Sequence, residues 1–141
     1  MRVLVVHNRY RSAFPSGENQ VVDQETALLC GAGHEVVVHE RSSDEIEGLR
    51  PSDKAMLPVR IVWSDSERRR LWRLLDEIRP DVVHVHNTFP LFSPSVLTAC
   101  RRLGVPVVMT LHNYRLMCAN GQLIRKGAPC RRCVGQMPTP A

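Results

Sequence analysis

The chain has 141 residues, of which 43% are hydrophobic and 23% are charged, and its formal net charge is +5. This length fits one ordinary domain, and this composition excludes the intrinsically disordered and fibrous classes. No stretch approaches the roughly 18 apolar residues of a membrane span, and the first apolar run is too short for a signal peptide. Because five cysteines is an odd number and no secretory signal precedes them, we expect a cytoplasmic protein with thiols that are reduced or bind metal.

Strand and helix patterns alternate along residues 1–111, which predicts an α/β domain built on a doubly wound, Rossmann-like parallel sheet. The expected strands are 1–6, 34–39, 82–86 and 105–111. The expected helices are 18–30, 64–78 and 93–102. Residues 40–58 are expected to be loop, with a short helix around 49–57 as the alternative, and residues 119–141 show no regular pattern. We expect a Rossmann-like domain over 1–117 and a cysteine-containing extension over 118–141 that is incomplete at its carboxy-terminal end.

The helix at 64–78 has the clearest signals in the chain. Ser64 and Glu67 have the spacing of a capping box, and leucines with Ile78 follow at positions i, i+3, i+4 and i+7. Its other face carries Arg68, Arg69, Arg70 and Arg73 with Trp72. That face is either a solvated outer surface or a contact with anionic lipid at the inner membrane face.

Polar residues follow each expected strand, where doubly wound sheets bind their ligands. These residues are His7-Asn8, His39, His86-Asn87 and His112-Asn113. His86 and Asn87 are candidates for hydrogen bonds to a hydroxylated substrate, with a structural role as the alternative. His112 is a candidate to bind, orient or relay a proton. We expect His84 and His86 to point to opposite faces of their strand, so that they would not share a metal ion.

The loop that contains Gly17 and Glu18 joins the first strand to the first helix. Backbone N–H groups and the helix dipole attract phosphate or carboxylate at such a position, although an ordinary turn would look the same. Gly17 would allow a ligand to approach the backbone. The sequence has no GxGxxG, so it carries no dinucleotide fingerprint.

Three cysteines lie late in the chain: Cys118, and the CxxC pair Cys130 and Cys133. Zinc sites favour such spacing but need four ligands when they are structural, so the fourth would be His112 or a residue beyond Ala141. Free thiols and a disulfide are the alternatives. A nucleic-acid partner is not expected, because aromatic residues for base stacking make up only 5% of the chain.

Several segments in order resemble the amino-terminal domain of the family 4 glycosyltransferases, which have the GT-B architecture. They are "MRVLVVHN", "PSGENQVVDQETALLCGAGHEVVV", "RPDVVHVHN", "GVPVVMTLHNYRLMC" and the trailing "CRRC". The resemblance covers about residues 1–133. It implies retaining transfer of a sugar from a nucleotide diphosphate sugar to a lipid-linked or saccharide acceptor, with no catalytic metal.

The resemblance also implies roles for single residues. Gly17 and Glu18 match the loop that approaches the donor phosphates and the acceptor, and His112 matches the histidine near the transferred sugar. His86 and Asn87 match the edge that faces the cleft. The family's carboxy-terminal domain, which grips the nucleotide, has no counterpart in this sequence, so we expect an inactive fragment. A non-enzymatic α/β binding module stabilised by zinc is the alternative function.

Overall fold

The computed structural model describes residues 1–134, which fall into two compact units. The first unit is Met1–Thr110, and the second begins at Leu111. The boundary expected after residue 117 therefore lies inside the second unit. Within residues 1–134, no helix has both the length and the apolar character needed to cross a membrane.

The first unit is built on a four-stranded parallel sheet with the strand order β2-β1-β3-β4. The chain starts in the middle at β1, moves outward to β2, and then returns to the other side of β1 for β3 and β4. This reversal defines a doubly wound sheet, so the predicted fold class is confirmed. The strands are β1 (Arg2–Arg9), β2 (Glu35–Ser42), β3 (Val82–Val85) and β4 (Val107–Met109).

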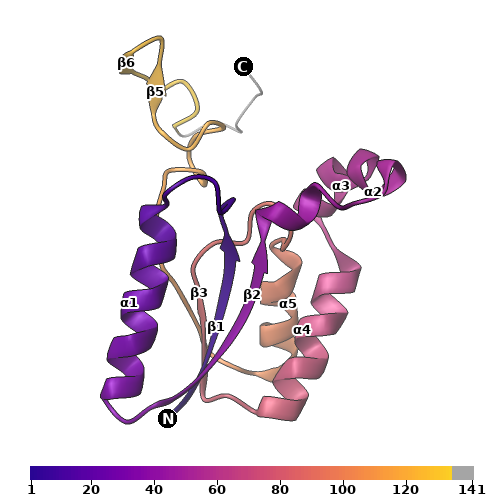
Figure 1. Ribbon diagram of the computed structural model, residues 1–141, viewed down its shortest axis with the longest axis vertical. Helices are drawn as coiled ribbons and strands as arrows, with labels where there is room; N and C mark the ends of the chain where they lie inside the picture. The colour runs from indigo at the N-terminus through magenta and orange to yellow at the C-terminus, as the bar shows by residue number, and fades with distance from the viewer. Residues whose placement is uncertain (135–141) are drawn as a thin grey trace. The chain divides into compact units, whose positions relative to one another are not determined.

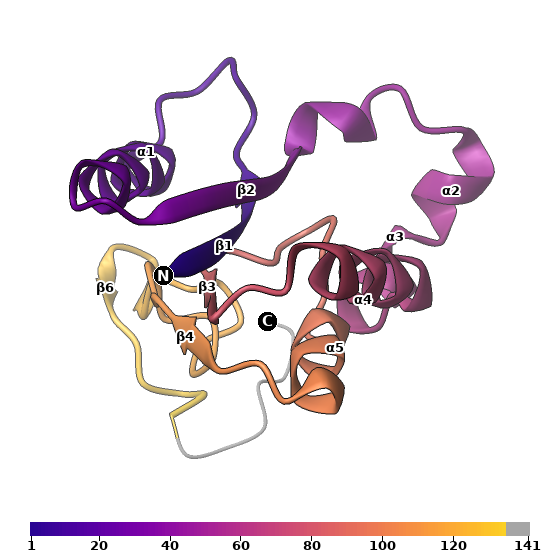
Figure 2. The ribbon, with the colours of Figure 1, turned by 90° about the horizontal axis from the view of Figure 1, so that it is seen from below.

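Helices cover both faces of this sheet, with α1 on one face and α4 with α5 on the other (Figures 1 and 2). The three predicted helices are confirmed, with bounds that shift by one or two residues. They are α1 (Gly17–Gly31), α4 (Asp65–Ile78) and α5 (Ser95–Leu103). The expected strand at 105–111 is shorter in the structure, because only β4 pairs with β3.

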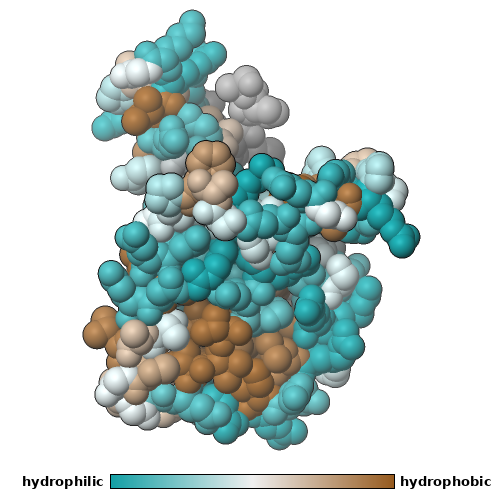
Figure 3. All heavy atoms as spheres, in the orientation of Figure 1, coloured by the Kyte–Doolittle hydropathy of each residue, from teal (hydrophilic) through white to brown (hydrophobic). Residues whose placement is uncertain are grey.

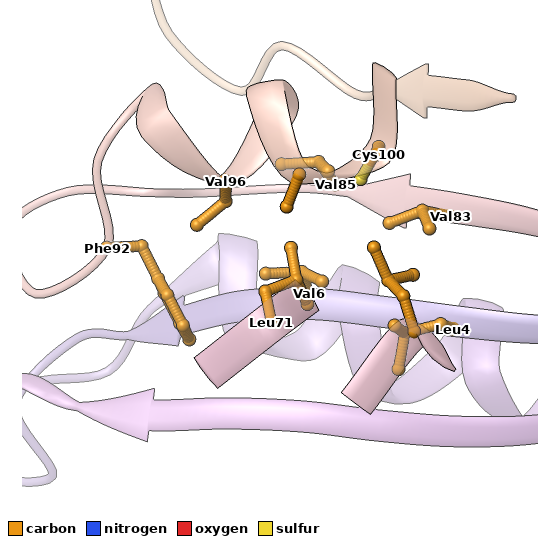
Figure 4. Packing of buried hydrophobic residues seen from close by; sticks show 10 residues of the cluster. Leu4, Val6, Leu71, Val83, Val85, Phe92, Val96 and Cys100 are labelled. Carbon is orange, nitrogen blue, oxygen red and sulfur yellow. The ribbon is translucent and has the colours of Figure 1, made fainter. Parts of the chain in front are cut away.

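The main core lies between the sheet and the α4–α5 pair (Figure 4). Alternate residues of β1 and β3 point to this face, as the two-residue period of a strand requires. The buried cluster consists of Leu4, Val6, Leu71, Leu75, Val83, Val85, Phe92, Val96, Ala99 and Cys100. On the opposite face of the sheet, Val3 and Val5 of β1 pack against Val22 of α1 in a smaller cluster. A hydrophobic area lies between α1 and α4 on the face drawn in Figure 3. On the edge strand β2, Val38 is 39% exposed.

Side-chain caps begin the two longest helices. The hydroxyl of Ser16 accepts a hydrogen bond from Asn19 N at α1, and that of Ser64 accepts one from Glu67 N at α4. The expected capping box at α4 is only half formed, because the Glu67 carboxylate pairs with Arg41 at 2.7 Å instead of reaching back to the cap. This ion pair joins α4 to the end of β2.

Residues 40–58 are more regular than expected. Strand β2 extends to Ser42, which caps a short 3-10 helix η1 (Ser43–Ile46) in a complete capping box with Glu45. Two short helices follow, α2 (Pro51–Ala55) and α3 (Leu57–Val62), and each has a proline in its first turn. The loop expectation was wrong, whereas its alternative, a short helix around 49–57, agrees with α2. These helices are too short to show a period, and proline in a first turn was their main signal.

The second unit contains a hairpin where no regular structure was expected. Strands β5 (Ile124–Arg125) and β6 (Ala128–Pro129) pair in antiparallel register. Lys126 and Gly127 connect them with φ angles of +51° and +75°. Two consecutive residues with positive φ match the right-handed twist of a tight hairpin, and glycine takes that conformation without strain.

Candidate functional site

The polar residues that the sequence predicts at the ends of β1 and β3 lie side by side. The chain adds β2 on one side of β1 and β3 on the other, so this is the point where the strand order reverses. His7 and Asn8 lie near the end of β1, and His86 and Asn87 follow β3, its neighbour. The backbones are joined here, since Asn8 N donates to Asn87 O at 2.8 Å. The Asn87 amide is already used inside the protein: its nitrogen donates to Asn8 O and Phe89 O, and its oxygen accepts from Phe89 N. These bonds favour a structural role for Asn87.

Asn8 holds the loops at this edge together and is completely buried. Its side-chain oxygen accepts from Leu91 N at 3.1 Å, in the loop after β3. Its side-chain nitrogen donates to Ser43 Oγ at 2.9 Å, at the end of β2. One carboxamide of β1 therefore holds the segments that follow two other strands, β2 and β3.

A pocket opens among those same loops. Its volume is about 290 Å³, and most of its lining is apolar. Tyr10, Arg11 and Phe14 come from the loop after β1, Ser43 and Ile46 from η1, and Phe89 and Pro90 from the loop after β3. The pocket thus lies at the carboxyl edge of the sheet, the usual ligand position in this fold class. Sequence analysis did not single out its aromatic residues.

Gly17 and Glu18 form the amino-terminal end of α1. A Cβ atom on Gly17 would meet nothing within 4 Å, so the space beside this residue is open. Tyr10 OH donates to Glu18 Oε1 at 3.4 Å, which links Glu18 to the wall of the pocket. Asn19 bonds His7 Nε2 at 2.9 Å and ties the start of α1 to β1.

His84 and His86 lie on the same face of the sheet, so the expectation that they point to opposite faces was wrong. Side chains alternate along a strand, and residues two apart therefore share a face. The ring centroids are 4.1 Å apart. Both rings face α1, where Glu25 Oε2 lies 3.3 Å from His86 Nε2 and 3.8 Å from His84 Nδ1.

Within residues 1–134, Glu25, His84 and His86 are the one group of three potential metal ligands whose atoms all lie within 4.8 Å of one another. Sequence analysis missed Glu25 as a site residue. A signal was present, because Glu25 shares its helical face with the apolar Val22 and Leu29, an uncommon position for a carboxylate.

His112 and Asn113 belong to the second unit. The Asn113 side-chain oxygen accepts from Arg115 N at 3.0 Å and lies 3.6 Å from the position that a Cβ on Gly121 would take. Gly121 has a φ of +74°, and its carbonyl accepts from Tyr114 N at 2.8 Å. Asn113 is therefore part of a compact turn that brings the residues after His112 back toward Gly121.

All five cysteines are free thiols, and Cys118, Cys130 and Cys133 lie in the second unit. Burial alone would raise the pKa of Cys118, but the backbone N–H groups of residues 120–123 lower it, and the resulting pKa is below the usual value. Backbone N–H groups that stabilise a thiolate also suit a metal-bound sulfur. Within the described part of the chain, these three sulfur atoms do not all lie within 4.8 Å of one another.

A Rossmann-like domain with an apolar pocket over its carboxyl edge has the architecture that is typical of ligand-binding α/β domains. Sequence comparison specifies it further: the family model described as Glycosyltransferase Family 4 matches residues 15–132. The chain belongs to this glycosyltransferase family, and the resemblance seen in its motifs is confirmed. Searches of curated proteins and of solved structures found no match.

Proposed function

We propose that this chain is the acceptor-side domain of a retaining glycosyltransferase of GT-B architecture. The donor is a nucleotide diphosphate sugar, and the acceptor is a lipid-linked sugar. A carboxy-terminal domain outside this sequence is the partner that holds the nucleotide, so the chain alone does not turn over. Family membership supports the transferase class. The pocket is the observation on which the proposed acceptor rests.

The composition of the pocket favours a lipid-linked acceptor over a free saccharide. Phe14, Ile46, Phe89 and Pro90 offer apolar surface at the edge of the sheet, whereas a free sugar needs many hydrogen-bonding groups. Arg11, also in the lining, has a cation suited to a phosphate between lipid and sugar. The proposed acceptor therefore has an isoprenoid-like tail near its phosphate.

The open space at Gly17 supports a role for the start of α1 in binding phosphate. A ligand there meets backbone N–H groups and the positive end of the helix dipole, which stabilise a diphosphate leaving group without a metal ion. In this proposal His112 faces the transferred sugar and Asn113 positions it, while His86 supports the cleft edge.

Exposed apolar residues of α3, together with the exposed Arg69 and Arg70 of the next helix α4, support peripheral contact with the cytoplasmic face of a membrane. On α3, Val59 is 58% and Val62 is 72% exposed, and Trp63 follows at 46%. Arginine and tryptophan side chains are suited to the headgroup region of anionic lipids. Sedimentation with vesicles should show stronger binding when anionic lipid is present, and Val62→Asp should weaken it. Equal binding to neutral and anionic vesicles would contradict the proposed attraction between arginines and anionic lipid.

The decisive experiment measures binding of a polyprenyl-phosphate-linked monosaccharide to the purified chain. Phe14→Ser should weaken binding about tenfold or more, because burial of such a side chain contributes roughly 1.5–3 kcal/mol. Leu28→Ser is the matched control. Leu28 is exposed to a similar degree, 72% against 67% for Phe14, but it lies on α1 outside the pocket. Equal losses in both variants would exclude the pocket as the acceptor site.

Calorimetry with a nucleotide diphosphate sugar tests whether the donor site lies mainly in the carboxy-terminal domain outside this sequence. Binding to this chain should be weak, and Gly17→Ala should weaken it further without unfolding α1. Tight binding of the nucleotide sugar would contradict a donor site that lies mainly in another domain.

We also propose a structural zinc site in the second unit, with Cys118, Cys130 and Cys133 as ligands. The lowered pKa of Cys118 supports it, since zinc binds the thiolate. Metal analysis of the protein purified under reducing conditions should find zinc that is lost in Cys130→Ser. Zinc that stays at the same level in that variant would refute these ligands.

A further inference from the structure

We propose that Glu25, His84 and His86 form a second site for a divalent transition-metal ion, with zinc as the expected ion. This site is separate from the cysteines, since all three ligands lie in the first unit. It is also separate from the proposed glycosyl transfer, which needs no metal. One carboxylate and two imidazoles are a common protein ligand set for zinc, with a water in the fourth position.

The distances between the three side chains suit one ion. Zinc lies about 2.0–2.2 Å from nitrogen and oxygen ligands, so neighbouring ligands of a tetrahedral site are about 3.3–3.5 Å apart. Glu25 Oε2 is 3.3 Å from His86 Nε2 and 3.8 Å from His84 Nδ1. All three ligand atoms lie within 4.8 Å of one another, and rotation of the side chains would bring them to tetrahedral spacing.

Glu25 Oε2 is buried but has no hydrogen-bond partner of good geometry within residues 1–134. A buried carboxylate oxygen is costly without a positive partner, and a metal ion would provide one. An ion bound to all three side chains would balance the charge of this carboxylate while it is also bound by the two imidazole rings.

Thr110 supplies the outer contact that metal-binding histidines usually have. His84 Nε2 lies 2.8 Å from Thr110 Oγ1. Metal binding at Nδ1 requires the proton on Nε2, and that N–H then donates to the threonine hydroxyl. Such contacts fix the tautomer and the ring orientation of a ligand.

The elements that carry the ligands are rigid. His84 lies in β3, His86 directly follows the end of that strand on the same face, and Glu25 lies in the middle of the 15-residue helix α1. The side chain of His86 is only 1% exposed, whereas that of Glu25 is 37% exposed. An ion can therefore reach the site from the side of Glu25.

The test uses the 141-residue chain with Cys118, Cys130 and Cys133 all changed to serine, which removes the thiols of the second unit. After treatment with a chelator, the protein is titrated with Co²⁺ and then with Zn²⁺. We expect one equivalent of Co²⁺ to give the ligand-field bands of a four-coordinate nitrogen and oxygen site, and Zn²⁺ to displace it. Absence of stoichiometric binding would overturn the proposal.

Single variants in this background identify the ligands. Glu25→Gln and His86→Asn should each lower the affinity at least tenfold, and His34→Asn, a histidine outside the group, should leave it unchanged. Thr110→Val keeps all three ligands and should weaken binding about 10–100-fold through the lost outer contact. Unchanged affinity in Glu25→Gln and Thr110→Val, with circular dichroism that confirms folding, would refute the assignment.

Discussion

Asn8→Ala tests whether one buried carboxamide holds the loops at the carboxyl edge of the sheet. Asn8 is 0% exposed and bonds Leu91 N and Ser43 Oγ. After the change, the buried Leu91 N–H loses its acceptor, which costs about 1–3 kcal/mol. Ser43 loses one bond, worth about 0.5–1.5 kcal/mol, but its hydroxyl still donates to Arg9 O. The expected loss in unfolding free energy is therefore about 2–4 kcal/mol.

Urea denaturation followed by circular dichroism measures this loss. The transition midpoint should fall with little change in slope, and the melting temperature should drop by about 10 °C or more. Gln24→Ala is the control, because it removes an exposed carboxamide from α1 and should change stability by less than about 0.5 kcal/mol. A loss below about 0.5 kcal/mol for Asn8→Ala would refute the structural role of this side chain. Binding of the lipid-linked sugar should weaken in the same variant, since the pocket that is proposed to bind it is formed by the released loops.

Three further predictions concern the first unit. Leu71→Ala should lower the unfolding free energy by about 2–5 kcal/mol in urea melts, because Leu71 is fully buried in the main core, and a loss below 1 kcal/mol would contradict that packing. Gly104→Ala should cost roughly 1 kcal/mol, since Gly104 ends α5 with a φ of +68°, and an unchanged melting temperature would argue against that conformation. The pKa of His39 is lowered below its usual 6.5, mainly by burial and further by the charges of Arg70 and Arg41. The folded state therefore binds fewer protons than the unfolded state. Stability should therefore fall as the pH drops below about 6.5, and thermal melts between pH 7.5 and pH 5 should show a smaller fall for His39→Asn; an equal fall in both proteins would exclude this contribution.

The fold could be predicted from sequence where a single segment carried a clear hydrophobic pattern. The leucine face of α4 and the continuous apolar run of β1 each identify an element without knowledge of the rest. Short elements gave weaker signals: α2 and α3 have five and six residues, fewer than two turns each. Their proline starts indicated a helix, but no period could support the indication.

The candidate site was predictable at the level of strand ends but not of partners. His7, Asn8, His86 and Asn87 were placed correctly at one edge, because parallel strands end together. Glu25 comes from a helix more than fifty residues earlier than His84, and only the packing of α1 on β3 brings them together. The shared face of His84 and His86, in contrast, follows from the two-residue period and could have been read directly from the sequence.

The pocket takes its walls from three loops that are separated along the chain but anchored at one place. Exchange of Phe14, Ile46 or Phe89 changes a wall without touching the strands below, because none of these residues belongs to the buried core clusters. In the proposed acceptor site, preference would therefore diverge through substitutions in any one loop while the sheet stays the same. For protein engineering, the three loops are separate positions at which a library can be introduced into one constant scaffold.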